Sequence, residues 1–206
     1  MTNKEWFLAL YYRDFRLFLF GQLISLSGTW MQSVAQGWLI YNLTKSPFYL
    51  GLVAAAGSLP ILLFTLVGGI AADRFRKRNL LLITQALSII PALLLGILTD
   101  INLIAVWHVV FLATLLGSVN AFDIPARQAF LVEMVEKGNL MNAIALNSAA
   151  FNDARIIGPV TAGMTIAYIG LPACFYLNAL SFIAVIIALS KMKHSCRQIG
   201  TKGNEN

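Results

Sequence analysis

The chain has 206 residues, of which 58% are hydrophobic and only 12% are charged, and its mean hydropathy is +0.74. A soluble domain usually carries about a quarter charged residues, and here the charges are clustered so that long stretches hold almost none. Apolar stretches of roughly 18 or more residues are typical of membrane spans. The composition therefore excludes a soluble domain and predicts an all-α membrane protein. The net charge of +6 then indicates basic cytoplasmic loops, and no nucleic-acid partner is expected.

Six apolar segments follow one another along the chain, separated by short polar or basic stretches. Residues 1–14 mix aromatic and basic side chains, which is typical of a cytoplasmic segment lying at the lipid headgroups. A polar connector over 125–139 follows the fourth apolar segment, and residues 191–206 form a basic cytoplasmic tail or linker. We predict a transmembrane domain over 15–190, with spans at about 15–41, 48–72, 80–98, 103–124, 141–169 and 172–190.

The distribution of Lys and Arg predicts the orientation of these spans. The N-terminus, the 73–78 loop, the 125–139 connector and the tail hold nearly all of these residues, whereas the alternate loops hold Lys45 alone. Basic loops face the cytoplasm, so we expect both termini on the cytoplasmic side of the cell (inner) membrane. Spans one to three and spans four to six then enter the bilayer in opposite senses. Two inverted three-helix repeats of this kind are a transporter architecture.

The first span carries a polar stripe made of Gln22, Ser25, Thr29, Gln32 and Gln36, at spacings of three and four residues. At about 100° per residue these side chains share one helical face. An unpaired amide in hydrocarbon costs several kcal/mol, so the stripe must face other helices or water. Interhelical hydrogen bonding is one interpretation. Three glutamines on one face favour the other interpretation, in which Gln22, Gln32 and Gln36 line a substrate or ion pathway.

The fifth span holds Asn152, Asp153 and Arg155 close to the middle of the bilayer. A charge at that depth indicates a functional site. Asp153 and Arg155 are two residues apart and therefore point to different sides of the helix, which excludes a direct pair. We predict that all three belong to the substrate or ion pathway, with Arg155 turned toward cavity water, a substrate anion or an acid on another helix. A structural arginine bonded to backbone carbonyls is the alternative.

Asp123 and Arg127 stand one helical turn apart around Pro125, near the cytoplasmic end of the fourth span. This spacing predicts a pair at the membrane boundary, which is a candidate cytoplasmic gate. The chain has no nucleophile elbow, Gly-rich phosphate loop or metal-binding motif. We therefore expect no enzyme activity and no cofactor, and coupling to protons or ions rather than to ATP.

The loop after the second span reads Gly69-Ile70-Ala71-Ala72-Asp73-Arg74-Phe75-Arg76-Lys77-Arg78. This resembles the signature loop of the major facilitator superfamily, G-x-L-x-D-R-x-G-R-[KR], and it lies at the same place between spans two and three. The matching residues are Gly69, Asp73, Arg74, Lys77 and Arg78, while Ala71 and Arg76 depart from the pattern. The resemblance implies a gating loop in which Asp73 locks one state of a transporter.

A second motif, Gly158-Pro159-Val160-Thr161-Ala162-Gly163 in the fifth span, looks like the G-P-x-x-G-G motif of superfamily exporters. The resemblance implies that Gly158, Pro159 and Gly163 bend the helix and allow close packing against another half. Finer features, among them Arg13-Asp14-Phe15-Arg16 and Ser46-Pro47, resemble the branch that contains the enterobactin exporter and the transmembrane secretion effectors.

The resemblance implies that the chain is one half of a twelve-span fold. The expected function is secondary active transport, with proton-driven export of a small organic molecule such as a siderophore or a drug. The expected partners are the substrate, protons, the lipid bilayer and a second six-helix half, supplied by a separate chain or by a second copy. The alternative is a membrane interaction or assembly protein without transport, or an inactive truncated permease. The small residues expected to face the second half are Gly21, Gly28, Gly51, Gly57, Gly68 and Gly163.

Overall fold

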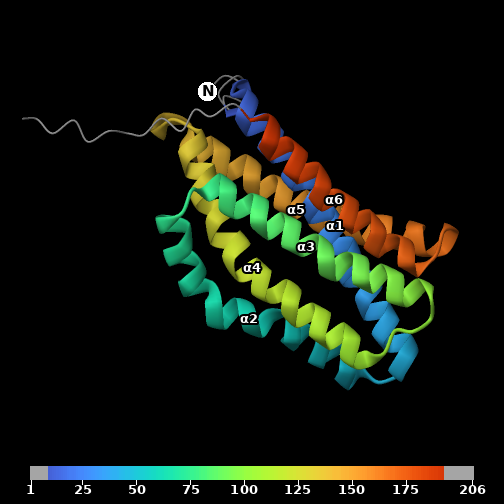
Figure 1. Ribbon diagram of the computed structural model, residues 1–206. Helices are drawn as coiled ribbons and strands as arrows, with labels where there is room; N and C mark the ends of the chain where they lie inside the picture. Colours follow the sequence, from blue (N-terminus) through green and yellow to red (C-terminus); the bar gives the residue numbers. More distant parts are fainter. Residues whose placement is uncertain (1–8, 193–206) are drawn as a thin grey trace, which may run out of the picture.

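The computed structural model of the protein describes residues 9–192 (Figure 1). All regular structure in this range is helical, so the all-α prediction is confirmed for it. The helices are α1 (Arg13–Thr44), α2 (Pro47–Arg74), α3 (Lys77–Asp100), α4 (Val106–Met134), α5 (Leu140–Tyr168) and α6 (Leu171–Lys191), with the short 3-10 helix η2 (Lys137–Asn139) ahead of α5. The tail predicted over 191–206 lies almost wholly outside the described residues, as do the first eight residues.

Local sequence explains how the chain reverses at its tightest turns. Lys45 adopts a left-handed φ of 52°, and its N–H donates to the Tyr41 carbonyl at 2.8 Å, which closes α1. Pro47 then opens α2 at a position whose N–H would have no partner inside the helix. Gly170, at a φ of 117°, joins α5 to α6, and a side chain would strain the backbone there.

The fourth helix is longer than the sequence predicts. α4 continues through Pro125 and ends at Met134, so it takes in most of the connector expected over 125–139. Membrane helices tolerate proline where neighbouring helices pack around the interrupted turn. Ala126, Phe130 and Leu131, which follow the proline, are all buried. Packing of these apolar side chains therefore extends the helix past a residue that would end it in water.

Successive helices run in opposite directions, so the loops gather at two ends of the bundle (Figure 1). The start of α1, the α2–α3 turn, the α4–α5 connector and the end of α6 lie together at what we call the basic end. Within residues 9–192, Lys45 lies at the opposite end and Arg155 in the middle of α5. The other basic residues of this range lie at or near the basic end: Arg13, Arg16, Arg74, Arg76, Lys77, Arg78, Arg127, Lys137 and Lys191.

The helices pack in the order α2, α4, α3, α6, α1 and α5 across the bundle. Buried apolar side chains fill the interfaces at both ends, among them Phe15 and Phe130 at the basic end and Ile40 and Phe175 at the other. α2 has one main neighbour, α4, and α5 has one main neighbour, α1. These two outer helices therefore leave most of their surface uncovered by the rest of the chain.

Four of the six helices, α2, α3, α4 and α6, are long and apolar enough to cross a membrane. Polar residues lower the hydropathy of α1 and α5, which carry the glutamine stripe and the Asn152–Arg155 segment respectively. A multi-pass membrane protein is therefore supported by length and composition, and the membrane-spanning role of α1 and α5 stays a prediction.

Several glycines serve contacts inside the chain, which corrects the prediction that they face a second half. A Cβ at Gly68 would meet the backbone of Ala121 on α4, and one at Gly21 would meet Ala188 on α6 at 3.2 Å. Gly28 also packs on α6, and Gly57 packs on α4. Gly51 and Gly163 have open space beside them. Close helix packing thus places most of these small residues at the interfaces of this bundle.

The adjacent glycines Gly68 and Gly69 provide a matched test of this packing. Gly68→Ala should lower stability by about 1–3 kcal/mol, because the new methyl would overlap the Ala121 carbonyl on α4. Gly69→Ala should be neutral or slightly stabilising, because its methyl meets nothing within 4 Å and alanine favours the helix. Thermal unfolding of the two purified variants in detergent measures the difference. Equal melting temperatures would show that the α2–α4 contact is looser than described.

Candidate functional site

The polar stripe of α1 faces the inside of the bundle for most of its length. Gln22, Ser25 and Gln32 are buried, and Gln36 is partly buried. The Gln32 Oε1 accepts a hydrogen bond of 2.7 Å from Asn178 Nδ2 on α6. Other helices of the same chain cover the face that carries Gln22 and Gln32, and their pathway role stays a prediction. Interhelical hydrogen bonding, the alternative interpretation, describes Gln32, and the pathway role of Gln36 stays a prediction.

Asn178 and Ser181 can reach α1 because residue 28 has no side chain. A Cβ at Gly28 would lie 2.5 Å from Asn178 Oδ1 and 2.6 Å from Ser181 Oγ. The Ser181 hydroxyl lies 2.7 Å from the Asn178 carbonyl and 3.0 Å from its Oδ1, which closes a small polar cluster. Sequence reasoning missed this cluster. An Asn and a Ser three residues apart in an otherwise apolar span are the pattern that could have revealed it.

The polar residues of α5 lie at the surface of the bundle. Asn152, Asp153 and Arg155 are exposed, and Asn152 Nδ2 donates to the Ser148 carbonyl at 2.8 Å. The guanidinium carbon of Arg155 lies 5.5 Å from the ring centroid of Trp30 on α1. Trp30 also packs edge to face with Phe151, at a centroid distance of 6.1 Å. The structure thus gives Arg155 an aromatic neighbour that sequence reasoning missed.

Arg155 and Trp30 lie on the side of the α1–α5 pair that points away from α6. On α1, Gly28 faces α6, and Trp30 is two residues and about 200° further round the helix. On α5, Gly158 faces α1, and Arg155 is three residues and thus about 60° from that direction. Asp153 points to the far side of α5, about 140° from Gly158. The Arg155–Trp30 pair is therefore open to whatever covers this face of the bundle.

A buried carboxylate joins α3 to α4 toward the basic end. Asp123 Oδ1 accepts hydrogen bonds from Thr84 Oγ1 at 2.7 Å and from Gln85 Nε2 at 2.8 Å, both on α3. Its Oδ2 pairs with Arg127, at 2.7 Å from Nη2 and 3.0 Å from Nε. The predicted pair is thus present, and the Asp123 side chain is only 7% exposed. The gating role stays a prediction, and the two α3 partners were not foreseen.

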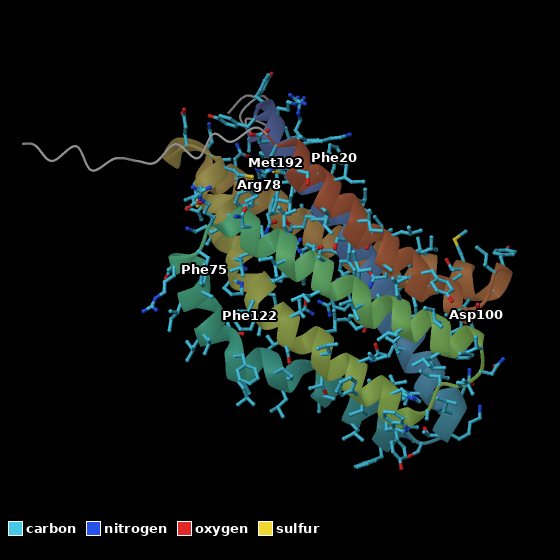
Figure 2. All side chains as sticks on the ribbon, in the orientation of Figure 1. Phe20, Phe75, Arg78, Asp100, Phe122 and Met192 are labelled. Carbon is cyan, nitrogen blue, oxygen red and sulfur yellow. The ribbon has the colours of Figure 1, made fainter. Side chains whose placement is uncertain are left out.

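The residues of the signature loop fall into two groups. Asp73 and Arg74 are exposed, whereas Lys77 pairs with Glu133 of α4 at 2.6 Å. Arg78 donates to the Leu189 carbonyl at 2.8 Å and to the Ser190 carbonyl at 3.0 Å, beside the end of α6 (Figure 2). These carbonyls lack partners within the helix, and a cation is favoured at a helix C-terminus. Lys77 and Arg78 therefore tie α3 to its neighbours, and Asp73 and Arg74 remain at the surface.

An apolar groove runs between the first turns of α2 and α4, at the end opposite the basic end. Its volume is about 610 Å³. Thr114 is the polar residue in its wall, and the Thr114 hydroxyl donates to the Val110 carbonyl at 2.8 Å. The groove therefore offers apolar contact rather than hydrogen bonds. Its lining residues are Leu52, Val106, Trp107, Val110, Phe111 and Thr114.

Comparison with known proteins identifies the family. A family model described as transmembrane secretion effector matches residues 7–201, which is nearly the whole chain. The chain belongs to the transmembrane secretion effector family. Its relatives are transporters of the major facilitator superfamily, as the signature loop suggested.

The similar proteins are transporters about twice as long as this chain. It is 32% identical over 164 residues to the staphyloferrin A transporter of Staphylococcus aureus, which covers 79% of this chain and 41% of the relative. It is 31% identical over 182 residues to the multidrug efflux pump Tap of Mycolicibacterium fortuitum. This match covers 86% of this chain and 44% of the pump. The enterobactin exporter EntS of Shigella boydii is 25% identical to the chain over 198 residues. This match covers 92% of this chain and 47% of the exporter. The chain thus spans about half the length of these curated relatives.

The Gly158–Gly163 motif packs inside the bundle at its first glycine. A Cβ at Gly158 would lie 2.8 Å from the Ser27 carbonyl on α1. Gly158 therefore brings α5 close to α1, and its role in packing against another half stays a prediction. Pro159 follows within α5, and Gly163, with nothing within 4 Å, lies on the exposed side. The contact of Gly163 with a second half stays a prediction.

Replacing Asp123 tests its role in joining α3 to α4. Asp123→Asn should lower the free energy of unfolding by about 3 kcal/mol, because it leaves Arg127, which is largely covered, without its counterion. Glu133→Gln, at the more exposed Lys77–Glu133 pair, should cost at most about 1 kcal/mol. Unfolding of the purified variants by sodium dodecyl sulfate in mixed micelles measures both. A smaller loss for Asp123→Asn than for Glu133→Gln would contradict the assignment.

Proposed function

We propose that the chain forms the N-terminal six-helix half of a proton-driven exporter of small organic molecules. The relatives are named as a transporter of staphyloferrin A, a multidrug efflux pump and an exporter of enterobactin. The chain aligns with somewhat under half of each of them. A second half, from a separate chain or a second copy, would complete the pathway.

Six spans arranged as two inverted repeats account for the helix packing. α1 packs on α5 and α6, just as α4 packs on α2 and α3. In this scheme α1 corresponds to α4, α2 to α5 and α3 to α6. Replacing each helix by its counterpart converts the neighbours of α1 into those of α4, and the α3–α6 contact is unchanged. α1 and α5, at 32 and 29 residues, would be about 48 and 44 Å long, enough to cross a hydrocarbon core of about 30 Å.

The single observation that carries the proposal is an exposed arginine halfway along α5. Arg155 lies 15 residues after Leu140 and 13 before Tyr168, so it would sit near the centre of the bilayer. A charge there costs about 2.5–3.5 kcal/mol on insertion scales, and such residues face a bundle interior or a water-filled cavity. Together with Asn152 and Gln36, it would form one wall of a substrate or ion pathway whose other wall is the second half. The pathway role of Asp153, which points to the other side of α5, stays a prediction.

The basic end would face the cytoplasm and carry the gate. Basic residues gather there, and Lys45 lies at the other end. Asp73 and Arg74 are exposed at the α2–α3 turn, where they could contact a second half. Asp123, Arg127 and the other residues that join α3 to its neighbours would hold this end rigid as the gate opens and closes.

Labelling of single cysteines tests the orientation. Cys174→Ser and Cys196→Ala first remove the native cysteines. A single cysteine is then introduced as Lys45→Cys or Arg76→Cys. In intact cells a membrane-impermeant maleimide should label position 45 and leave position 76 unlabelled until the cells are opened, because basic loops are retained in the cytoplasm. Equal labelling of both positions in intact cells would contradict the topology.

Reconstitution tests transport. Proteoliposomes that contain the purified chain should move an organic dye, ethidium or fluorescein, when a proton gradient is applied, and a protonophore should abolish the movement. Empty liposomes and liposomes with heat-denatured chain are the controls. Transport that persists without a gradient would contradict proton drive. Absence of transport of both dyes would contradict an exporter made of copies of this chain alone, and would favour a second half from a separate chain or a membrane interaction or assembly role.

A further inference from the structure

Arg155 is the one basic residue of the described chain that lies far from both ends of the bundle. It takes part in no ion pair among residues 9–192, where Lys77 pairs with Glu133 and Arg127 pairs with Asp123. The nearest acid in sequence, Asp153, points to a different side of α5. A guanidinium at the middle of a membrane helix is favoured by an anion or by water, and the described residues supply no anion.

Trp30 and Phe151 define the rest of this surface. The guanidinium carbon of Arg155 lies over the Trp30 ring at 5.5 Å from its centroid, which is within the range of a cation–π contact and leaves the N–H groups available for hydrogen bonding. Phe151 stands edge-on to the indole and is 43% exposed. A charged donor edge and an exposed aromatic ring therefore lie side by side, across the boundary between α5 and α1.

This arrangement selects the chemistry of the ligand. The guanidinium presents parallel N–H groups that match the two oxygens of a carboxylate. The adjacent aromatic side chains favour a flat unsaturated group over a saturated one, because flat rings stack or pack edge to face with them. A cation would be repelled by Arg155, and a purely apolar molecule would leave its N–H groups unpaired.

We propose that Arg155, Trp30 and Phe151 form a subsite for an organic anion whose carboxylate is carried on a flat conjugated ring. The proposal rests on the proposed function in one respect, since the subsite must open to a pathway rather than to lipid. It goes further in naming the class of substrate. Asn152, exposed one turn before the arginine and with its amide nitrogen bonded to the Ser148 carbonyl, offers its side-chain oxygen to a hydroxyl on such a ring.

The test is binding of three probes to the full chain in lipid nanodiscs, measured by equilibrium dialysis. Benzoate is flat and anionic, cyclohexanecarboxylate is anionic but not flat, and benzylammonium is flat but cationic. The wild-type chain should bind benzoate most tightly and benzylammonium least. Arg155→Gln should weaken benzoate binding at least tenfold, because the charge-assisted hydrogen bonds are lost.

Two further variants separate the charge from the stacking. Arg155→Lys keeps the charge but loses the planar fork, so it should retain part of the affinity and lose most of the preference for benzoate over cyclohexanecarboxylate. Trp30→Leu should reduce the same preference at least threefold. Lys45→Gln, at the far end of the bundle, is the matched control and should leave all three affinities unchanged. If Arg155→Gln fails to fold, Arg155→Lys and Trp30→Leu still test the subsite.

Two outcomes would overturn the subsite: no benzoate binding to the wild-type chain, or equal binding to the wild type and Arg155→Gln. Failure of the subsite is distinguishable from failure of the exporter. Proton-driven movement of ethidium without benzoate binding would support the proposed transport and contradict the subsite. Benzoate binding that depends on Arg155, without movement of any dye, supports the subsite and contradicts transport by copies of this chain alone.

Discussion

Hydrocarbon offers no hydrogen-bond partner, so each polar side chain in a membrane helix must find one on a neighbouring helix or open onto water. This constraint organises the bundle. Gln32 on α1 is bonded to Asn178 on α6, and Asp123 on α4 is bonded to Thr84 and Gln85 on α3. These two polar contacts lie at the α1–α6 and α4–α3 interfaces, which correspond to each other in the pattern of helix neighbours. Polar bonding thus specifies the inner neighbours of α1 and α4.

The outer helices, α2 on α4 and α5 on α1, are held by close backbone contact at glycines. α2 approaches α4 where Gly68 and Gly117 allow backbone contact, and α5 approaches α1 at Gly158. Close contact of this kind gains dispersion energy, which drives helix association where the hydrophobic effect does not operate. Each of α1 and α4 therefore has a polar-bonded partner on one side and a glycine-packed partner on the other. Glycines that a sequence alone assigns to a second half are in large part needed for this internal packing.

The number of helices, their approximate positions and the Asp123–Arg127 pair could be predicted, because apolar runs and an i,i+4 spacing are local patterns. The sequence alone could not predict which part of the bundle the glutamine stripe faces. Periodicity shows that the glutamines share a face, but what covers the face depends on Asn178, 146 residues beyond Gln32. The neighbour of Arg155 is hidden for the same reason, since Trp30 lies on a distant helix. α4 continues beyond the span predicted at about 103–124, because burial of Phe130 outweighs the effect of Pro125.

The same constraint separates polar residues that build the bundle from those left for function. Asp123 has its charge neutralised by Arg127 and its remaining oxygen bonded to α3, so it rigidifies two helices and has little left to offer a ligand. Arg155 lies over the ring of Trp30 and has no counterion within the described chain. Its hydrogen bonds can be supplied by water, by a ligand or by another chain at the exposed surface. Polar groups that the bundle satisfies internally therefore hold the helices together, and Arg155 is a charge left open to a partner.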